Sequence, residues 1–467
     1  MLREEVWFAT IDELAPELRA DRLSPIELTR GFLDRIDRWN GRFNAFERPT
    51  HEVALELAAR AASDLRANRW RGPLHGIPYA AKDLFDTRLV PTAWGTRFLR
   101  DRVPSENATV VNRLEAAGAI LLGKTAMVEF AGCLGYRFAN ASASGPGRNP
   151  WDAARWTGGS SSGSGAAVAA GLATFALGTE TWGSILCPSA FCGLTGMRPT
   201  YGLVSRAGGM VGAYTFDKVG PLARSVGDCR TVLAAIAGSD PRDPSCAADR
   251  PRLDRGAGRA WRSLRAARVS LDWSKAGEPE VRAAFEAAVA ELSTAGLHVE
   301  EAKLPDVPAA EVAGLLIGVE ALAAFEPFLN DGRARQLVDE LAPRQREIAE
   351  SVTGADTIKA MRIREAIQRE MREFFTRFDV IVTPNFMSVA PPVEQDLNEA
   401  LPYGDPMGAL AAACGLPGLA LPAGTARAGM PAGFQLVAAP FEEATLLDLG
   451  EMYQSRTQHH RQHPAIT

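Results

Sequence analysis

The stretch from Thr157 to Glu180 constrains the fold of this chain more than any other. It begins with the loop "TGGSSSGSG" (157–165) and continues directly into "AAVAAGLATFALGTE" (166–180). The Ala-rich part predicts a buried helix, and the short apolar run after it predicts a buried strand. A flexible linker would not run straight into a buried helix. We therefore expect the strand to be internal and to deliver the chain to Ser184.

Helical and strand-like segments alternate along the rest of the chain. Helical periodicity covers 10–70, with a helix start at Ser24-Pro25, and most of 276–380. Strands are predicted at 76–85, 119–125, 267–273, 298–304, 379–386 and in the Gly/Pro-rich run 415–440. The loop-like residues 238–262 could link two domains. The later strands nevertheless fit the same layered sheet, which favours an α/β fold.

Composition and charge exclude several classes of protein. The chain has 467 residues, 46% hydrophobic residues and a net charge of −5, so it carries no electrostatic footprint for nucleic acid or an anionic membrane. No apolar run reaches the roughly 18 residues that a membrane span needs. The N-terminus lacks the layout of a secretory signal. We expect a cytoplasmic protein that binds neither nucleic acid nor membrane.

The six cysteines show no paired spacing of the kind that holds a metal ion. Six thiols in a chain of this length are expected to be reduced and mostly buried. Cys187 lies three residues after Ser184, but its neighbours Leu186 and Pro188 indicate packing rather than chemistry. No metal is predicted.

Lysine is rare, with six residues against 45 arginines, so each lysine is worth inspecting. Lys82 closes the predicted strand "GIPYAAKDLF". It could be a surface residue paired with Asp83 or Asp86. Alternatively, it is desolvated, which would lower its pKa and let it act as a base near neutral pH.

The Gly/Ser loop and Ser184 also carry possible chemistry. The loop fits neither GxxxxGK[ST] nor GxGxxG, which disfavours a nucleotide site. Ser184 lacks a GxSxG setting, and no lysine follows a serine at SxxK spacing. A serine nucleophile needs a base, and no histidine lies near these loops in sequence. Lys82 is the plausible substitute, acting through another serine.

Four segments together resemble the amidase signature family. They are "GIPYAAKDL", "GGSSSGSGAAVA", "GTETWGSILCPSAFCGLTGMRPTYGLVSR" and "GLPGLALPAG…GMPAGFQLVA", in order and over nearly the whole chain. The resemblance implies one large α/β domain over 1–467, with a central mixed twisted sheet covered by helices on both faces. Its expected parts are N-terminal helices (1–70), the catalytic core (71–235), a linker and mostly helical cover (236–380), and closing strands with a C-terminal helix (381–467). Homodimers are common in the family.

The resemblance also implies a catalytic triad and no cofactor. Lys82 corresponds to the base, Ser160 to the bridging serine behind a cis peptide bond, and Ser184 to the nucleophile. The backbone N–H groups of Thr181, Trp182, Gly183 and Ser184 are expected to form the oxyanion hole.

The nucleophile loop departs from the family's D-T-G-G-S-I-R pattern. Glu180 replaces the Asp, Trp182 a Gly, and Leu186 the Arg. Loss of that Arg requires Glu180 to find another cation, for which Arg198 and Arg206 are candidates. The indole of Trp182 must lie either in packing or along the substrate cleft.

Residues 126–140 are expected to border the cleft, with Met127 and Tyr136 in a substrate pocket together with Trp182 and Asp405. Core packing is the alternative for this segment, which also contains Glu129 and Phe138. The predicted activity is hydrolysis of a small, fairly apolar carboxamide or anilide. The alternatives are a glutaminase subunit of a tRNA-dependent amidotransferase, where Asp405 would hold the substrate amino group, or hydrolysis of carbamates, ureas or hydrazides. A non-catalytic protein, or a nucleotide-binding protein that uses the Gly/Ser loop, is the remaining hypothesis.

Overall fold

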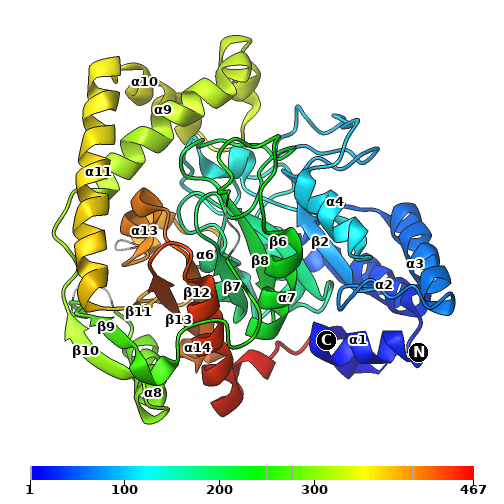
Figure 1. Cartoon of the computed structure of the whole chain (residues 1–467). Helices are drawn as coiled ribbons and strands as arrows, with labels where there is room; N and C mark the ends of the chain where they lie inside the picture. The colour runs from blue at the N-terminus through cyan, green and yellow to red at the C-terminus, as the bar shows by residue number, and fades with distance from the viewer. Residues whose placement is uncertain (1–2, 249–250, 275–276, 402–403, 467) are drawn as a thin grey trace.

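The computed structural model describes residues 3–248, 251–274, 277–401 and 404–466. Within these ranges the centre of the molecule is an eleven-stranded sheet with helices around it (Figure 1). From one edge to the other the strands are β1 (Phe46–Pro49), β3 (Ile120–Thr125), β2 (Pro78–Lys82), β6 (Phe175–Glu180), β8 (Lys218–Ala223), β7 (Thr195–Arg198), β12 (Gly418–Thr425), β13 (Pro431–Ala438), β11 (Val380–Pro384), β9 (Arg265–Val269) and β10 (His298–Ala302). A separate hairpin joins β4 (Arg148–Asn149) to β5 (Asp152–Trp156).

The sheet is mixed, as predicted. β2 runs parallel to both β3 and β6, and β9 runs parallel to both β10 and β11, whereas the other neighbours are antiparallel. Parallel neighbours end at the same edge of a sheet. The register pairs Ala81 with Leu177, so the ends of β2 and β6 meet. This edge carries the candidate site.

Helices flank the sheet, and several begin where the sequence predicts. Ser24 caps its helix by accepting a hydrogen bond from the Ile26 N–H at 3.3 Å, with Pro25 as the first helical residue. Thr10 and Glu13 form a capping box. The helices are α1 (Ile11–Arg19), α2 (Pro25–Phe43), α3 (His51–Arg66), α4 (Thr109–Ala116), α5 (Ser162–Ala169), α6 (Leu186–Cys192), α7 (Val226–Ile236), α8 (Pro279–Thr294), α9 (Ala309–Asn330), α10 (Leu341–Glu350), α11 (Gly354–Arg377), α12 (Leu397–Ala400), α13 (Gly408–Cys414) and α14 (Glu443–Arg456).

Helix α5 and strand β6 are the buried pair predicted from residues 157–180. Every residue of both elements is buried. The small side chains of α5 allow close approach to its neighbours, because a Cβ at Gly163 would lie 2.2 Å from the Ala45 carbonyl oxygen. The lack of bulk in this helix is therefore a packing requirement of the interior.

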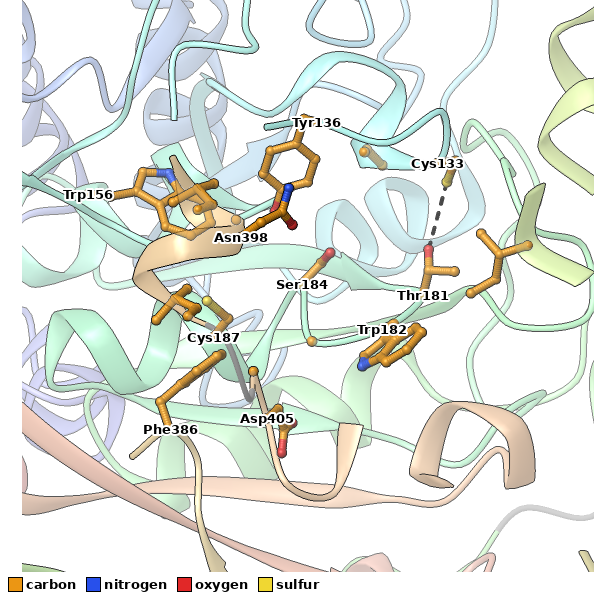
Figure 2. Close-up of a pocket in the computed structure, with 18 residues that line it drawn as sticks. Cys133, Tyr136, Trp156, Thr181, Trp182, Ser184, Cys187, Phe386, Asn398 and Asp405 are labelled. Atoms are coloured by element: carbon orange, nitrogen blue, oxygen red, sulfur yellow. Dashed lines mark hydrogen bonds between the residues drawn. The ribbon is translucent and has the colours of Figure 1, made fainter. Parts of the chain in front are cut away.

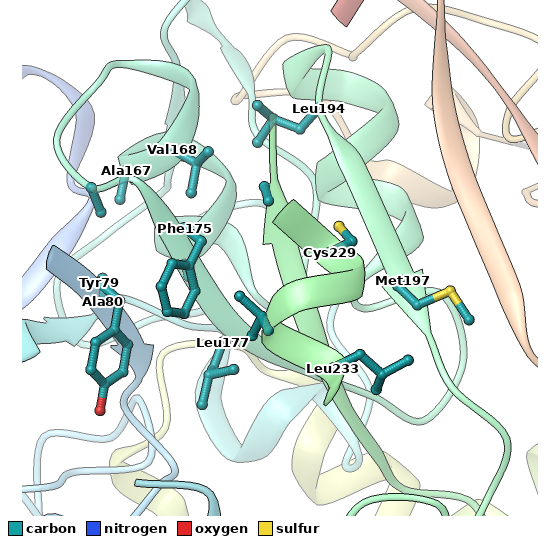
Figure 3. Close-up of a cluster of buried hydrophobic side chains, with 14 of the residues drawn as sticks. Tyr79, Ala80, Ala167, Val168, Phe175, Leu177, Leu194, Met197, Cys229 and Leu233 are labelled. Carbon is teal, nitrogen blue, oxygen red and sulfur yellow. The ribbon is translucent and has the colours of Figure 1, made fainter. Parts of the chain in front are cut away.

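The main apolar core forms around these central strands. Figure 3 shows Tyr79 of β2, Phe175 and Leu177 of β6, and Met197 of β7 in one buried cluster. The rings of Tyr79 and Phe175 stack with centroids 5.2 Å apart, across the parallel β2–β6 pair. This packing fixes β2 against β6 near the start of both strands, and the site lies at their opposite ends.

The strands predicted beyond residue 262 join the same sheet. β11, β9 and β10 continue it outward from β13. β9 begins at Arg265 rather than 267, because its pairing with β10 aligns Arg265 with His298. The residues before it are mostly loop, so 238–262 connect parts of one sheet.

Among the described residues, helix α9 is long and apolar enough to cross a membrane by length and composition alone. One-third of its most apolar window is buried in the molecule. Core helices of soluble proteins pass the same test, so this is weak evidence for a span.

Candidate active site

Lys82 is the last residue of β2 and is fully buried. Its Nζ lies 2.7 Å from the Ser160 Oγ and 3.0 Å from the Thr179 Oγ1, with the Thr179 carbonyl oxygen at 3.5 Å. The parallel pairing of β2 and β6 explains the contact with Thr179, since both residues stand at the same strand ends. Of the two alternatives that the sequence left open, Lys82 is the desolvated lysine and not a surface lysine.

The two aspartates that could have paired with Lys82 interact with other cations. Asp83 lies 3.7 Å from the buried Lys124, and Asp86 lies 2.7 Å from Arg102. Burial lowers the pKa of Lys82 to about 7, although the nearby groups Cys133, Asp217 and Glu180 act in the opposite direction. Lys82 can thus be neutral near physiological pH, as a general base requires.

Ser160 stands at the entry to α5 and is also fully buried. The Gly159–Ser160 peptide bond is cis, as the resemblance implies. The carbonyl oxygen of Ser160 accepts a hydrogen bond from the Val128 N–H at 3.1 Å. The next N–H, that of Ser161, donates to the Ser184 carbonyl oxygen at 3.4 Å. The Gly/Ser loop therefore lies against the turn that carries Ser184.

Ser184 lies in the turn after β6 and is 7% exposed. Gly183 adopts a φ of +87°, a conformation that favours glycine, whereas Trp182 is not among the residues with positive φ. The turn thus tolerates Trp182 in place of glycine. Among the described residues, the N–H groups of Trp182, Gly183 and Ser184 donate to no protein acceptor.

Glu180 anchors the far end of this turn. Its carboxylate accepts hydrogen bonds from the N–H groups of Ile185 at 2.8 Å and Leu186 at 3.0 Å. Arg198 is the cation that replaces the missing arginine, with its Nη1 at 2.6 Å from Glu180. Burial would raise the pKa of Glu180, but Arg198 and Lys218 hold it below its usual value.

Arg206, the other candidate partner of Glu180, pairs with Asp243 at 3.4 Å. It also donates to the Tyr214 carbonyl oxygen. Of the two cations named from the sequence, Arg198 is the one that holds Glu180.

Ser184 opens onto a cavity of about 420 Å³ (Figure 2). Apolar and aromatic side chains dominate its wall, and no lysine, arginine or histidine is among the described residues that form it. The lining residues are Ala131, Gly132, Cys133, Tyr136, Trp156, Gly159, Thr181, Trp182, Gly183, Ser184, Cys187, Ile317, Phe386, Leu397, Asn398, Leu401, Gly404 and Asp405.

Trp182 lines this cavity with 38% of its surface exposed. Its other edge packs against the start of α13, where a Cβ at Gly408 would lie 2.5 Å from the indole Nε1. The indole of Trp182 therefore does both: it packs against Gly408 and it forms part of the cavity wall. Cys187 also borders the cavity, where burial raises the pKa of its thiol and keeps it protonated.

Of the other predicted pocket residues, Tyr136 and Asp405 line the cavity and Met127 does not. Met127 lies two residues after the end of strand β3 and is fully buried in the main apolar core. Its expected place in the pocket is wrong, and the packing alternative holds for it. Tyr136 contacts Trp156 edge-on, with ring centroids 6.1 Å apart.

Asp405 is the carboxylate of the cavity wall. It accepts hydrogen bonds from the Met407 N–H at 2.8 Å and from the Gln435 Nε2 at 2.6 Å. Burial raises its pKa to about 6, opposed by the Met407 N–H and Arg198. Asp405 can therefore accept hydrogen bonds from a polar or cationic group of a substrate.

Sequence reasoning missed most of the wall contributed by residues 386–405. Phe386, Leu397, Asn398 and Leu401 enter the cavity from the segment between β11 and α13, and no local pattern marks them. Thr179 and Lys218 were missed as well. For Lys218, the scarcity of lysine was a usable signal, because Lys124 and Lys218 are buried like Lys82.

Comparisons with known proteins agree with this geometry. A family model described as Amidase matches residues 27–447. The glutamyl-tRNA(Gln) amidotransferase A-subunit of Moorella thermoacetica is 38% identical over 495 aligned positions, which cover 99% of each chain. The structure of a peptide amidase from Stenotrophomonas maltophilia matches with a TM-score of 0.84 and 31% identity, over 96% of this chain and 97% of that one. The glutamyl-tRNA(Gln) amidotransferase A-subunit from Thermotoga maritima matches with a TM-score of 0.82 and 26% identity, over 98% and 97%.

Proposed function

Because the chain belongs to the amidase family, whose members act on C–N amide bonds, we propose that it hydrolyses a small, largely apolar carboxamide or anilide through an acyl-enzyme on Ser184. The observation that carries this proposal is the buried Lys82–Ser160 pair, 2.7 Å apart, beside a serine that opens onto an apolar cavity. A lysine of lowered pKa next to a serine is a base that can activate a second serine without histidine.

The reaction follows from these groups. Neutral Lys82 takes a proton from Ser160 while Ser160 takes one from Ser184, and the Ser184 Oγ attacks the substrate carbonyl carbon. The developing oxyanion accepts hydrogen bonds from backbone N–H groups of residues 181–184, and one such hydrogen bond is worth about 3–4 kcal/mol. The relay then returns the proton to the leaving nitrogen, and the C–N bond breaks. Water attacks the acyl-enzyme by the same route and releases the carboxylate.

The cavity supports an uncharged acyl group. Its wall is mainly Trp156, Phe386, Leu401 and similar apolar side chains, and its described residues offer no cation for a substrate carboxylate. A carboxylate buried there without a partner would lose its hydration without compensation. The planar N–C=O unit of carbamates, ureas and hydrazides fits the same chemistry, so these are alternative substrates.

A glutaminase subunit of a tRNA-dependent amidotransferase is the second candidate, and relatives favour it. The amidotransferase protein of Moorella thermoacetica is 38% identical over nearly the full length of both chains. Asp405 offers a carboxylate for the amino group of glutamine. The described residues that line the cavity include no cation for the glutamine carboxylate, which counts against this candidate. If it is correct, the chain works as one component of a larger enzyme.

The test is a substrate panel of aliphatic amides, anilides, carbamates and glutamine, with wild type and Ser184→Ala. We expect wild type to cleave an apolar amide, and Ser184→Ala to lose that activity. Glutamine hydrolysis that requires partner subunits would support the second candidate instead. If wild type cleaves nothing on the panel, or Ser184→Ala keeps full activity, the hydrolase mechanism is wrong.

A serine-reactive phosphonate provides a second check. Labelling of wild type but not of Ser184→Ala is expected, and its absence would favour a non-catalytic protein. A cytoplasmic location and a homodimer remain predictions about the protein in the cell.

A further inference from the structure

Lys218 is a buried lysine that the mechanism above does not use. It is the first residue of β8, pairs in register with Glu180 of β6, and is 2% exposed. Its Nζ donates to two carbonyl oxygens, that of Thr181 at 3.3 Å and that of Phe216. The first of these contacts reaches the turn that carries Ser184.

Thr181 is held at two of its polar atoms. Its carbonyl oxygen accepts from Lys218, and its hydroxyl donates to the carboxylate of Asp217. That carboxylate is itself fixed by the N–H groups of Gly212 at 2.8 Å and Ala213 at 3.0 Å. Side chains therefore hold the turn at its start, through Thr181, as well as at its far end, which Glu180 anchors.

The hydrogen bond from Lys218 determines which way the next peptide group faces. The Thr181–Trp182 bond is trans, because the cis bond among the described residues is Gly159–Ser160. In a planar trans peptide the carbonyl oxygen and the N–H point in opposite directions. Because the Thr181 carbonyl oxygen is turned toward buried Lys218, the Trp182 N–H points away from Lys218, and the Trp182 residue itself lines the cavity.

We propose that Lys218 is a positioning residue for the oxyanion hole: by holding the Thr181 carbonyl oxygen, it orients the Trp182 N–H toward the substrate oxyanion. This rests on the proposed function. A donor on the carbonyl also polarises the peptide group, which strengthens its N–H as a donor. The proposal assigns Lys218 an effect on the transition state and none on substrate binding.

The decisive variant is Lys218→Met, which keeps the length of the side chain but removes its donor. With the best substrate of the wild type, we expect kcat to fall by roughly 10- to 100-fold, less than the 10²–10³ seen when an oxyanion donor is deleted outright. KM should stay within about 2-fold of wild type, because the interaction is made in the transition state. Affinity for phenylboronic acid, which forms a tetrahedral adduct with the serine, should fall by a similar factor to kcat.

Lys124→Met is the matched control. Lys124 is also fully buried and donates to the Phe85 carbonyl oxygen and the Thr92 hydroxyl, without contacting the 181–184 turn. We expect this variant to lose thermal stability but to retain kcat and boronate affinity. Lys218→Gln, with an uncharged donor on a shorter side chain, should lie between Lys218→Met and wild type.

The proposal is overturned if Lys218→Met, or Lys218→Gln where the first variant does not fold, keeps wild-type kcat and boronate affinity. It is also overturned if Lys124→Met loses kcat to the same extent, since a general effect of removing a buried lysine would then explain both results. A wild type without Ser184-dependent activity would contradict the proposed function instead, so the two failures are distinguishable.

Discussion

At the scale of single residues, the protonation of Lys82 should set the pH dependence of the reaction. Its pKa is lowered to about 7 by burial, against the opposing effects of Cys133, Asp217 and Glu180. Only the neutral amine can accept a proton, so kcat/KM should rise with pH, reach half its maximum near pH 7, and level off above. The measurement is a pH profile of kcat/KM on a substrate that does not ionise in this range.

Two variants test whether Lys82 is the group that titrates. Lys82→Arg keeps its proton at all accessible pH values and should lose on the order of 10²–10⁴-fold in kcat/KM. Lys218 also has its pKa lowered to about 7, by burial and by Arg198. Because both lysines could titrate near pH 7, Lys218→Met separates them. If Lys82 is the base, this variant should be less active but keep the same acid limb in its pH profile. If the acid limb disappears in Lys218→Met, the group that titrates is Lys218 and not Lys82.

Trp182 and Gly408 should act together on substrate size. Trp182→Ala removes an aromatic wall, and Gly408→Ala places a methyl group where the indole now packs. We expect the ratio of kcat/KM between a bulky and a small amide to change by about 10-fold or more in each variant. Turnover of the small amide should change less, because the backbone N–H of residue 182 remains.

The double variant sharpens this test. If the two residues form one unit of the wall, their effects on selectivity should not add. If the ratio of kcat/KM between the bulky and the small amide stays at the wild-type value in both single variants, Trp182 has only a packing role.

At the scale of helices and strands, elements with a local pattern were predictable and the cavity wall was not. The buried α5–β6 pair and the Ser24-Pro25 helix start follow from neighbouring residues. The segment that contributes Asn398 depends instead on distant contacts, such as the Leu397 N–H that donates to the Arg137 carbonyl oxygen at 2.9 Å. Contacts between residues so far apart in the chain leave no periodicity to detect.

The same reasoning explains which site residues could be predicted. Lys82 ends an apolar strand and is one of few lysines, so its position alone raised the question of a base. Met127 could not be placed this way, because a residue just after a strand can face the core or the cleft, and packing decides. The charge of Glu180 indicated that it needs a cation and left Arg198 and Arg206 as candidates. Only the fold shows that Arg198 is the partner, because Arg206 pairs with Asp243.

The packing of α5 yields a prediction at this scale. Gly163→Ala would place a methyl group 2.2 Å from the Ala45 carbonyl oxygen, so we expect the free energy of unfolding to fall by about 1–3 kcal/mol. Gly314→Ala in α9 is the control, since nothing lies within 4 Å of its Cβ position. It should stabilise the protein by about 0.5–1 kcal/mol. Equal effects of the two variants in denaturant titrations would contradict the packing argument.

At the scale of the whole molecule, the strand order interleaves distant parts of the chain. β12 and β13, from the end of the chain, lie between the catalytic strands and the outer strands β9, β10 and β11. The chain ends are also tied to the body and lie close together (Figure 1): the Ile11 N–H donates to Asp228 at 2.8 Å, and Arg461 contacts Glu13 at 2.8 Å. No cut along the sequence separates a catalytic half from a cover.

This arrangement predicts one cooperative unfolding transition. The outer strands cannot leave without exposing the edge of β13, and β13 cannot leave without exposing the edge of β12, which pairs with β7. Calorimetry, near-ultraviolet circular dichroism and phosphonate labelling of Ser184 should therefore report the same midpoint. A lower-temperature transition that leaves Ser184 fully reactive would mean that the outer part, 265–384, folds as a separate unit. In that case the subdivision near residues 238–262 would be a true domain boundary, and the cavity wall from 386–405 would be the piece that joins the two.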